Sequence, residues 1–153
     1  MKKSIKKKFN MYFDGEAKAH KKRFLSDLNT MGYPFLFAEA QYPENAMVFV
    51  HYLKNKDVVR ELGEEFSGVS AAETSGPAPR GVYINKDAYE NPPKWWASPS
   101  EYQKYVIRHE VTHTFGVGHA PPLKNGICDL MTHQTRKPSC KTNANLVLVS
   151  GLS

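Results

Sequence analysis

Eleven residues in the last third of the chain carry side chains that bind metal ions. Residues 109–119 read HEVTHTFGVGH, which places three histidines and a glutamate in the pattern HExxHxxGxxH. His109 and His113 are four residues apart, so on a helix they lie on one face about one turn from each other and can bind one ion. Gly116 can adopt the positive φ that ends a helix, which lets His119 turn back as a third ligand.

This pattern favours a catalytic zinc ion. Three protein nitrogens leave a fourth coordination position open, whereas a structural zinc is closed by four protein ligands. Glu110 lies beside the first ligand, where its carboxylate can take a proton from zinc-bound water, whose pKa the metal lowers to about 7. A purely structural site has no use for this glutamate. We therefore predict one catalytic Zn²⁺ held by His109, His113 and His119, with Glu110 as the general base.

Length and charge limit the remaining possibilities. The chain has 153 residues and is 41% hydrophobic, which is enough for one domain with a core. We predict a basic N-terminal tail over residues 1–8 and a single catalytic domain over residues 9–153. The formal net charge is +6, and removing the five lysines of the tail leaves 6 − 5 = +1. The basic character is therefore mostly local, and no nucleic-acid motif with interleaved aromatic residues accompanies it.

No stretch of the sequence has the 18 or more apolar residues of a membrane span, and no apolar segment follows the first lysines as in a signal peptide. We expect a monomer without a membrane segment, and the sequence does not settle its location. Cys128 and Cys140 have eleven residues between them. This separation permits a disulfide, while two reduced thiols fit the sequence equally well.

The pattern of apolar residues predicts the elements around the motif. Alternation predicts strands over residues 8–13, 35–40, 46–53 and 82–85. Ala17, Phe24, Leu28 and Met31 recur at helical spacing, which predicts a helix that packs against the sheet. Residues 61–80 hold few large apolar side chains, so we expect a surface loop that lines a cleft. We also expect the indoles of Trp95 and Trp96 to be buried.

The helix that carries the histidines has a clear start. Ser98 is a suitable N-cap, Pro99 suits the first helical position, and Glu101 completes a capping box. We therefore expect the helix to begin near Pro99, with Tyr102 and Tyr105 packing into the core.

The motif resembles that of the metzincin metallopeptidases, which place a methionine turn below the zinc. Here that turn is residues 128–132, and Met131 stands twelve residues after His119. Most of the chain is also similar to a family of small, mostly secreted bacterial metzincin-like domains of unknown function. This likeness extends over the strand at 82–85, the helix at 102–119, Met131 to Gln134, and Cys140 with the residues that follow it. The resemblance implies an α+β zincin fold: a twisted mixed sheet, a backing helix, an active-site helix and an irregular C-terminal subdomain.

The resemblance also suggests a role for His133. Astacin-like and serralysin-like members have a tyrosine two residues after the methionine, where it can reach the metal or the tetrahedral intermediate. His133 occupies this position, so it is a candidate for stabilising the oxyanion, and the alternative is a polar residue that faces the cleft or solvent.

Zinc-dependent hydrolysis of a peptide bond is the function that the motif and the resemblance predict together. The expected partner is a peptide or protein substrate that pairs with the cleft edge as an added strand. Two alternatives remain. One is a catalytically idle zinc-binding domain that binds a peptide or protein partner, and the other is a nucleic-acid-associated protease that uses its lysine tail.

Overall fold

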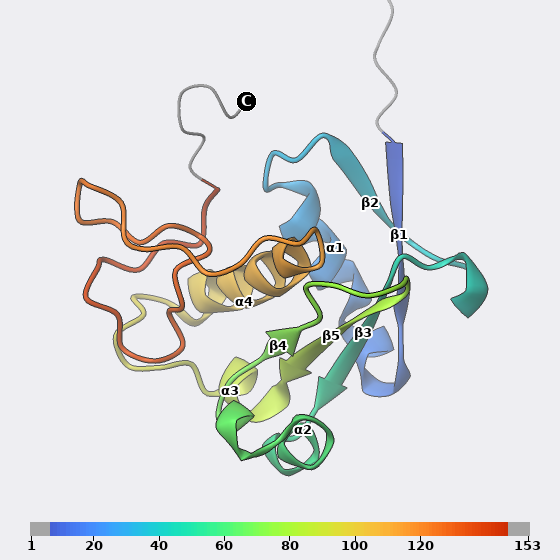
Figure 1. Cartoon of the computed structure of the whole chain (residues 1–153), viewed down its shortest axis with the longest axis horizontal. Coiled ribbons are helices and arrows are strands. Elements are labelled where there is room, and N and C mark those ends of the chain that lie inside the picture. Colours follow the sequence, from blue (N-terminus) through green and yellow to red (C-terminus); the bar gives the residue numbers. More distant parts are fainter. Residues whose placement is uncertain (1–6, 147–153) are drawn as a thin grey trace, which may run out of the picture.

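The computed structural model describes residues 7–146, and the fold is α+β (Figure 1). Within these residues a five-stranded mixed sheet is combined with four α-helices. The strands are β1 (Lys7–Phe13), β2 (Phe35–Glu39), β3 (Val48–Leu53), β4 (Ala71–Ala72) and β5 (Arg80–Asn85). The helices are α1 (Lys21–Asn29), α2 (Asn55–Leu62), α3 (Lys86–Glu90) and α4 (Pro99–His113), and short 3₁₀ segments cover Gly15–His20, Pro43–Asn45 and Glu64–Phe66.

The sheet has the order β2-β1-β3-β5-β4. Strands β2, β1, β3 and β5 are parallel to one another. Strand β4 is antiparallel to β5, with Ala71 opposite Tyr83 and Ala72 opposite Val82. The prediction of a mixed sheet is therefore confirmed. The short strand β4 ends the sheet on the side that faces α4 and the C-terminal segment (Figure 1).

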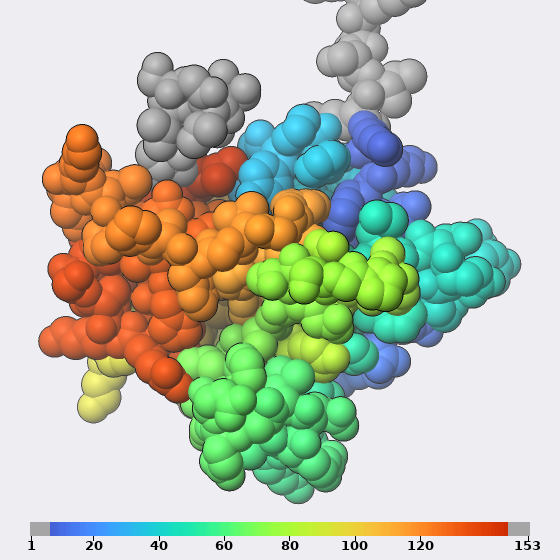
Figure 2. Space-filling view, viewed as in Figure 1, coloured from blue at the N-terminus to red at the C-terminus, as the bar shows by residue number. Residues whose placement is uncertain are grey.

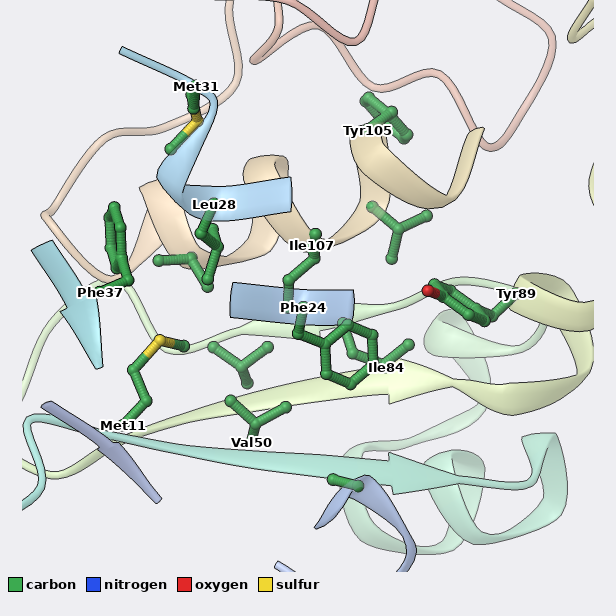
Figure 3. Close-up of a cluster of buried hydrophobic side chains, with 14 of the residues drawn as sticks. Met11, Phe24, Leu28, Met31, Phe37, Val50, Ile84, Tyr89, Tyr105 and Ile107 are labelled. Carbon is green, nitrogen blue, oxygen red and sulfur yellow. The ribbon is translucent and has the colours of Figure 1, made fainter. Parts of the chain in front are cut away.

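One face of the sheet is covered by α1 and α4. Alternate residues of the strands, such as Met11, Val50 and Ile84, point into the core because successive strand side chains face opposite ways. Phe24 of α1 and Ile107 of α4 meet them from the other side (Figure 3). The helix that carries the histidines is thus anchored in the main hydrophobic core.

The ends of α4 follow the predicted signals. Ser98 Oγ accepts a hydrogen bond from the backbone N–H of Glu101 at 3.1 Å, and Pro99 begins the helix. After His113 the chain continues through one turn to Gly116, whose φ of +85° is in the left-handed region that favours glycine. The helix therefore stops where the motif predicts.

Three predictions about local structure were incomplete or wrong. Residues 61–80 are not one surface loop, because α2 extends to Leu62, a 3₁₀ turn follows, and Ala71–Ala72 pair with β5. No prediction covered α2 or α3, which are eight and five residues long. Trp96 is buried as expected, but Trp95 is 38% exposed. Both indole nitrogens donate to the same carbonyl oxygen, of Gln134, so both rings stay near one edge of the core.

The C-terminal segment, residues 114–146, is irregular, as predicted (Figure 1). It is held by side chains and by a few backbone hydrogen bonds, including the isolated bridge between Ile127 and Lys141. Cys128 and Cys140 form a disulfide. The fully buried Gln134 hydrogen-bonds the backbone of Asp129 and of Asn143. The predicted basic tail lies outside the described residues except for Lys7 and Lys8, and no helix within residues 7–146 is long and apolar enough to cross a membrane.

Candidate metal centre

Helix α4 brings two histidine rings together. His109 and His113 are both buried, and their Nε2 atoms are 3.1 Å apart. The four-residue spacing on one helix face produces this approach. Their ring planes are nearly perpendicular, at 89°.

The opposite nitrogen of each ring is already occupied. His109 Nδ1 lies 2.8 Å from the carbonyl oxygen of Leu130, and His113 Nδ1 lies 2.6 Å from that of Val117. A carbonyl oxygen only accepts hydrogen bonds, so each Nδ1 must carry the proton. In the neutral imidazole this leaves each Nε2 with a lone pair and no hydrogen.

Two lone pairs at 3.1 Å do not form a hydrogen bond, and a cation between them would relieve their repulsion. Protonation does not supply it, because burial lowers the pKa of His109 to about 3 and also lowers the pKa of His113. Two imidazole nitrogens bound to one tetrahedral zinc at about 2.0–2.1 Å lie about 3.3 Å apart. The observed separation therefore suits a shared metal ion.

Glu110 completes a buried group with these two histidines. Donor atoms of His109, Glu110 and His113 all lie within 4.8 Å of one another. One carboxylate oxygen of Glu110 is 3.9 Å from His113 Nε2, beyond direct hydrogen bonding. Burial raises the pKa of this carboxyl to about 8. The chain thus places a poorly solvated acid beside a group that can hold a metal ion.

His119 comes close to the other two rings of the motif. Its ring centroid is 5.3 Å from that of His109 and 4.8 Å from that of His113, although its side chain is exposed. The donor atoms divide differently from the prediction. A second group joins His109 and His119 to His133, all within 4.8 Å, and His113 is not part of it.

Met131 occupies the turn that the resemblance suggested. The backbone N–H of Thr132 donates to the carbonyl of Asp129, and Asp129 Oδ1 accepts from the N–H of Met131. Met131 is only 4% exposed and joins the main core. The residue before it, Leu130, supplies the carbonyl that orients His109, so the turn reaches the metal group through its backbone.

Two arginines that the sequence analysis did not single out hold α4 in place. Arg108, adjacent to the first histidine, is buried and donates to the carbonyl oxygens of Asp27 and Ala144. Arg80, at the start of β5, donates at 2.7 Å to the carbonyl oxygen of Thr114, just after the end of α4. No spacing rule identifies them, because their partners are backbone atoms far away in the sequence.

A cleft of about 540 Å³ lies over these side chains. One wall is formed by residues between 65 and 74, including β4, and the other by residues between 133 and 136. The space-filling view shows the surface hollowed between the green and the orange-red parts of the chain that carry these walls (Figure 2). Arg136 crosses from one wall to the other, since Nη2 donates to the carbonyl oxygen of Glu65 at 3.1 Å. The prediction that residues 61–80 line a cleft is therefore confirmed for their middle part.

Comparison with known proteins assigns no family, because no family model and no curated protein matches the chain. The structure shows a possible metal-binding group of His109, Glu110 and His113 on a helix, within an α+β fold that has a mixed sheet. The candidate metal group rests on two observations: the Nε2 atoms of His109 and His113 are 3.1 Å apart, and the Nδ1 atom of each ring lies within hydrogen-bond distance of a carbonyl oxygen.

Proposed function

We propose that this protein is a zinc-dependent metallopeptidase that hydrolyses peptide bonds in the cleft above α4. The observation that carries this proposal is the pair of unprotonated Nε2 atoms of His109 and His113, 3.1 Å apart, with the carboxylate of Glu110 beside them. Imidazole donors without a thiolate suit zinc, and His119 is the candidate third ligand. A bound zinc ion would supply a Lewis acid that acidifies a water molecule and polarises the scissile carbonyl.

Glu110 is suited to the role of general base. Its carboxyl is buried and burial raises its pKa, so its ionisation depends strongly on nearby charge. A cation at the neighbouring histidines lowers its pKa and favours the ionised form. An ionised, poorly solvated carboxylate is an effective proton acceptor, and it can return the proton to the leaving amine.

The substrate is proposed to be an extended peptide. Strand β4 ends the sheet and also lines the cleft, so its outer edge faces the space above the metal group. A peptide that pairs with this edge is held by backbone hydrogen bonds, which recognise the main chain of many sequences. In this arrangement the scissile peptide bond of the substrate would lie next to Glu110.

The alternative function is a zinc-binding domain without turnover. One variant, compared with a matched control, separates the two functions. Glu110→Gln keeps the shape of the side chain but cannot accept a proton, so zinc content should stay the same while hydrolysis of a peptide library falls by at least about 10²-fold. His51→Ala is a matched control, because His51 lies on β3 and does not line the cleft. Stoichiometric zinc in a wild-type protein that cleaves no peptide would establish the idle domain instead.

A further inference from the structure

A second cavity, of about 510 Å³, adjoins the cleft above α4. Thr135 lines both cavities. On the opposite wall Gly68 lines the second cavity, and the next residue, Val69, lines the cleft. The two cavities therefore share a border on each wall, and an extended chain that occupies the cleft can continue into the second cavity.

Trp95 presents an aromatic surface in this second cavity. The residue is 38% exposed, and it lines the cavity. Its Nε1 atom donates to the carbonyl oxygen of Gln134 at 3.0 Å, which fixes the ring. In Figure 1 the segment between α3 and α4 runs beside the C-terminal segment that carries Gln134. Trp96 donates to the same oxygen but is buried in the core. Trp95 is therefore a fixed ring with surface that a ligand can cover.

Asp87 supplies a negative charge in the same cavity. Among the described residues that line the cavity, it is the only ionisable one, and Trp95 is the only aromatic one. Asp87 Oδ2 accepts a hydrogen bond from the backbone N–H of Asn55 at 2.7 Å, which holds the carboxylate in place. The neighbouring Lys86 pairs with Glu16 instead. Within residues 7–146 no salt bridge neutralises Asp87.

A carboxylate and an exposed indole in one cavity suit a positively charged side chain. The indole is the aromatic ring that attracts cations best, and the carboxylate adds an ion pair. Asp87 would repel an acidic side chain, and an aliphatic side chain gains nothing from it. Lysine and arginine fit both groups, because their apolar stems can pack against the ring while the charged end reaches the carboxylate.

We propose that the second cavity is a subsite for a lysine or arginine side chain of the substrate, held by Trp95 and Asp87. The substrate is then an extended peptide with a basic residue at a fixed distance from the scissile bond. This inference rests on the proposed function, because it takes the adjoining cleft as the place of hydrolysis. Binding of the basic side chain itself needs neither zinc nor turnover, so the two proposals can be tested separately.

Nuclear magnetic resonance of the isotope-labelled, full-length protein tests the subsite without turnover. The probe is Nα-acetyl-arginine amide, and the indole N–H signals of Trp95 and Trp96 report its binding. The Trp95 signal should shift saturably, with a Kd in the millimolar range for a single side chain, and the signal of the buried Trp96 should shift much less. Nα-acetyl-citrulline amide has nearly the same shape without the charge, and it should bind at least about 3-fold more weakly. An unchanged Trp95 signal, or equal affinities for the two probes, would overturn the proposal.

Asp87→Asn tests the carboxylate. The amide oxygen can still accept the N–H of Asn55, so the local fold is kept. The Kd of the arginine probe should rise about 3- to 5-fold, which is the effect of one partly exposed ion pair. Glu44→Gln is the matched control, because Glu44 is exposed and lines neither cavity, and it should leave this Kd unchanged. An Asp87→Asn protein with the wild-type Kd would contradict the proposal.

A peptide-library digest with the zinc-loaded protein connects the subsite to the substrate. Lysine and arginine should be enriched at one position relative to the cleaved bond. Asp87→Asn should lose this enrichment and still cleave peptides that lack basic residues. Cleavage by the wild type without the enrichment would refute the subsite and leave the proposed function standing. A wild-type protein that cleaves nothing would refute the proposed function, and saturable binding at Trp95 would then still establish a cavity for basic side chains.

Discussion

Glu110 should control how the stability of the metal-free protein depends on pH. Burial raises the pKa of its carboxyl from 4.5 to about 8. Because the folded pKa is raised, the contribution of this group to stability is fully present below pH 4.5 and is lost as the pH rises towards 8 and beyond. Given the rise from 4.5 to about 8, at about 1.4 kcal/mol for each tenfold change in proton affinity, the total loss is about 5 kcal/mol.

The contribution of the buried histidines to stability depends on pH in the opposite direction. Burial lowers the pKa of His109 to about 3 and that of His133 to about 4, so their contribution is present above about pH 6.5 and is lost as the pH falls. Glu110→Gln removes only the carboxyl and leaves the histidines in place. The difference between the wild type and this variant therefore isolates the glutamate.

Urea unfolding of chelator-treated protein, followed by the fluorescence of Trp95 and Trp96, measures this difference. Between pH 5 and pH 8 the free energy of unfolding of the wild type should fall by about 4 kcal/mol relative to Glu110→Gln. With saturating zinc the difference should shrink, because the cation favours the ionised carboxylate. Parallel pH profiles of the two metal-free proteins would show that Glu110 is solvated and would refute the reasoning.

Four further predictions follow from the same contacts. His109→Ala and His113→Ala should each lose tight zinc binding, measured as metal content after gel filtration, because one imidazole fewer leaves a much weaker set of ligands. Met131→Ala should lower the free energy of unfolding by about 2–5 kcal/mol in urea titration, since the side chain is buried in the core, and an unchanged value would mean that its site is readily repacked. Reduction of the disulfide between Cys128 and Cys140 should cost about 3 kcal/mol of stability, from the length of the closed loop, and equal midpoints with and without reductant would contradict this. Ser98→Ala should cost about 1 kcal/mol by removing the N-cap of α4, and Ser98→Asp should retain the cap and the stability.

Residues whose partners are near in sequence could be predicted. The spacing of His109 and His113 requires only a helix, and the start of that helix follows from Ser98 and Pro99. The strands β1, β2, β3 and β5 follow from alternating apolar residues, since each is long enough to show the pattern.

Features that depend on distant backbone atoms could not be predicted. Ala71–Ala72 form a strand only because β5 lies beside them, and two alanines have no strand pattern of their own. The carbonyl groups that orient the two histidines belong to Val117 and Leu130. Every residue has a backbone carbonyl group, so the sequence does not show which of them will accept a hydrogen bond from a histidine. The resemblance drew attention to His133, but its membership in a second donor group became visible only in three dimensions.

The hydrogen bond from His109 to the carbonyl of Leu130 has a consequence for protein synthesis. The ring of His109 can take its metal-binding orientation only after a residue 21 positions further along the chain has folded against it. The disulfide that closes over this segment uses Cys140, which leaves the ribosome later still. Until residue 130 has emerged, the ring of His109 lacks this hydrogen-bond partner. If these histidines bind a metal ion as we propose, the ion is therefore bound only after the segment around Leu130 has folded against α4.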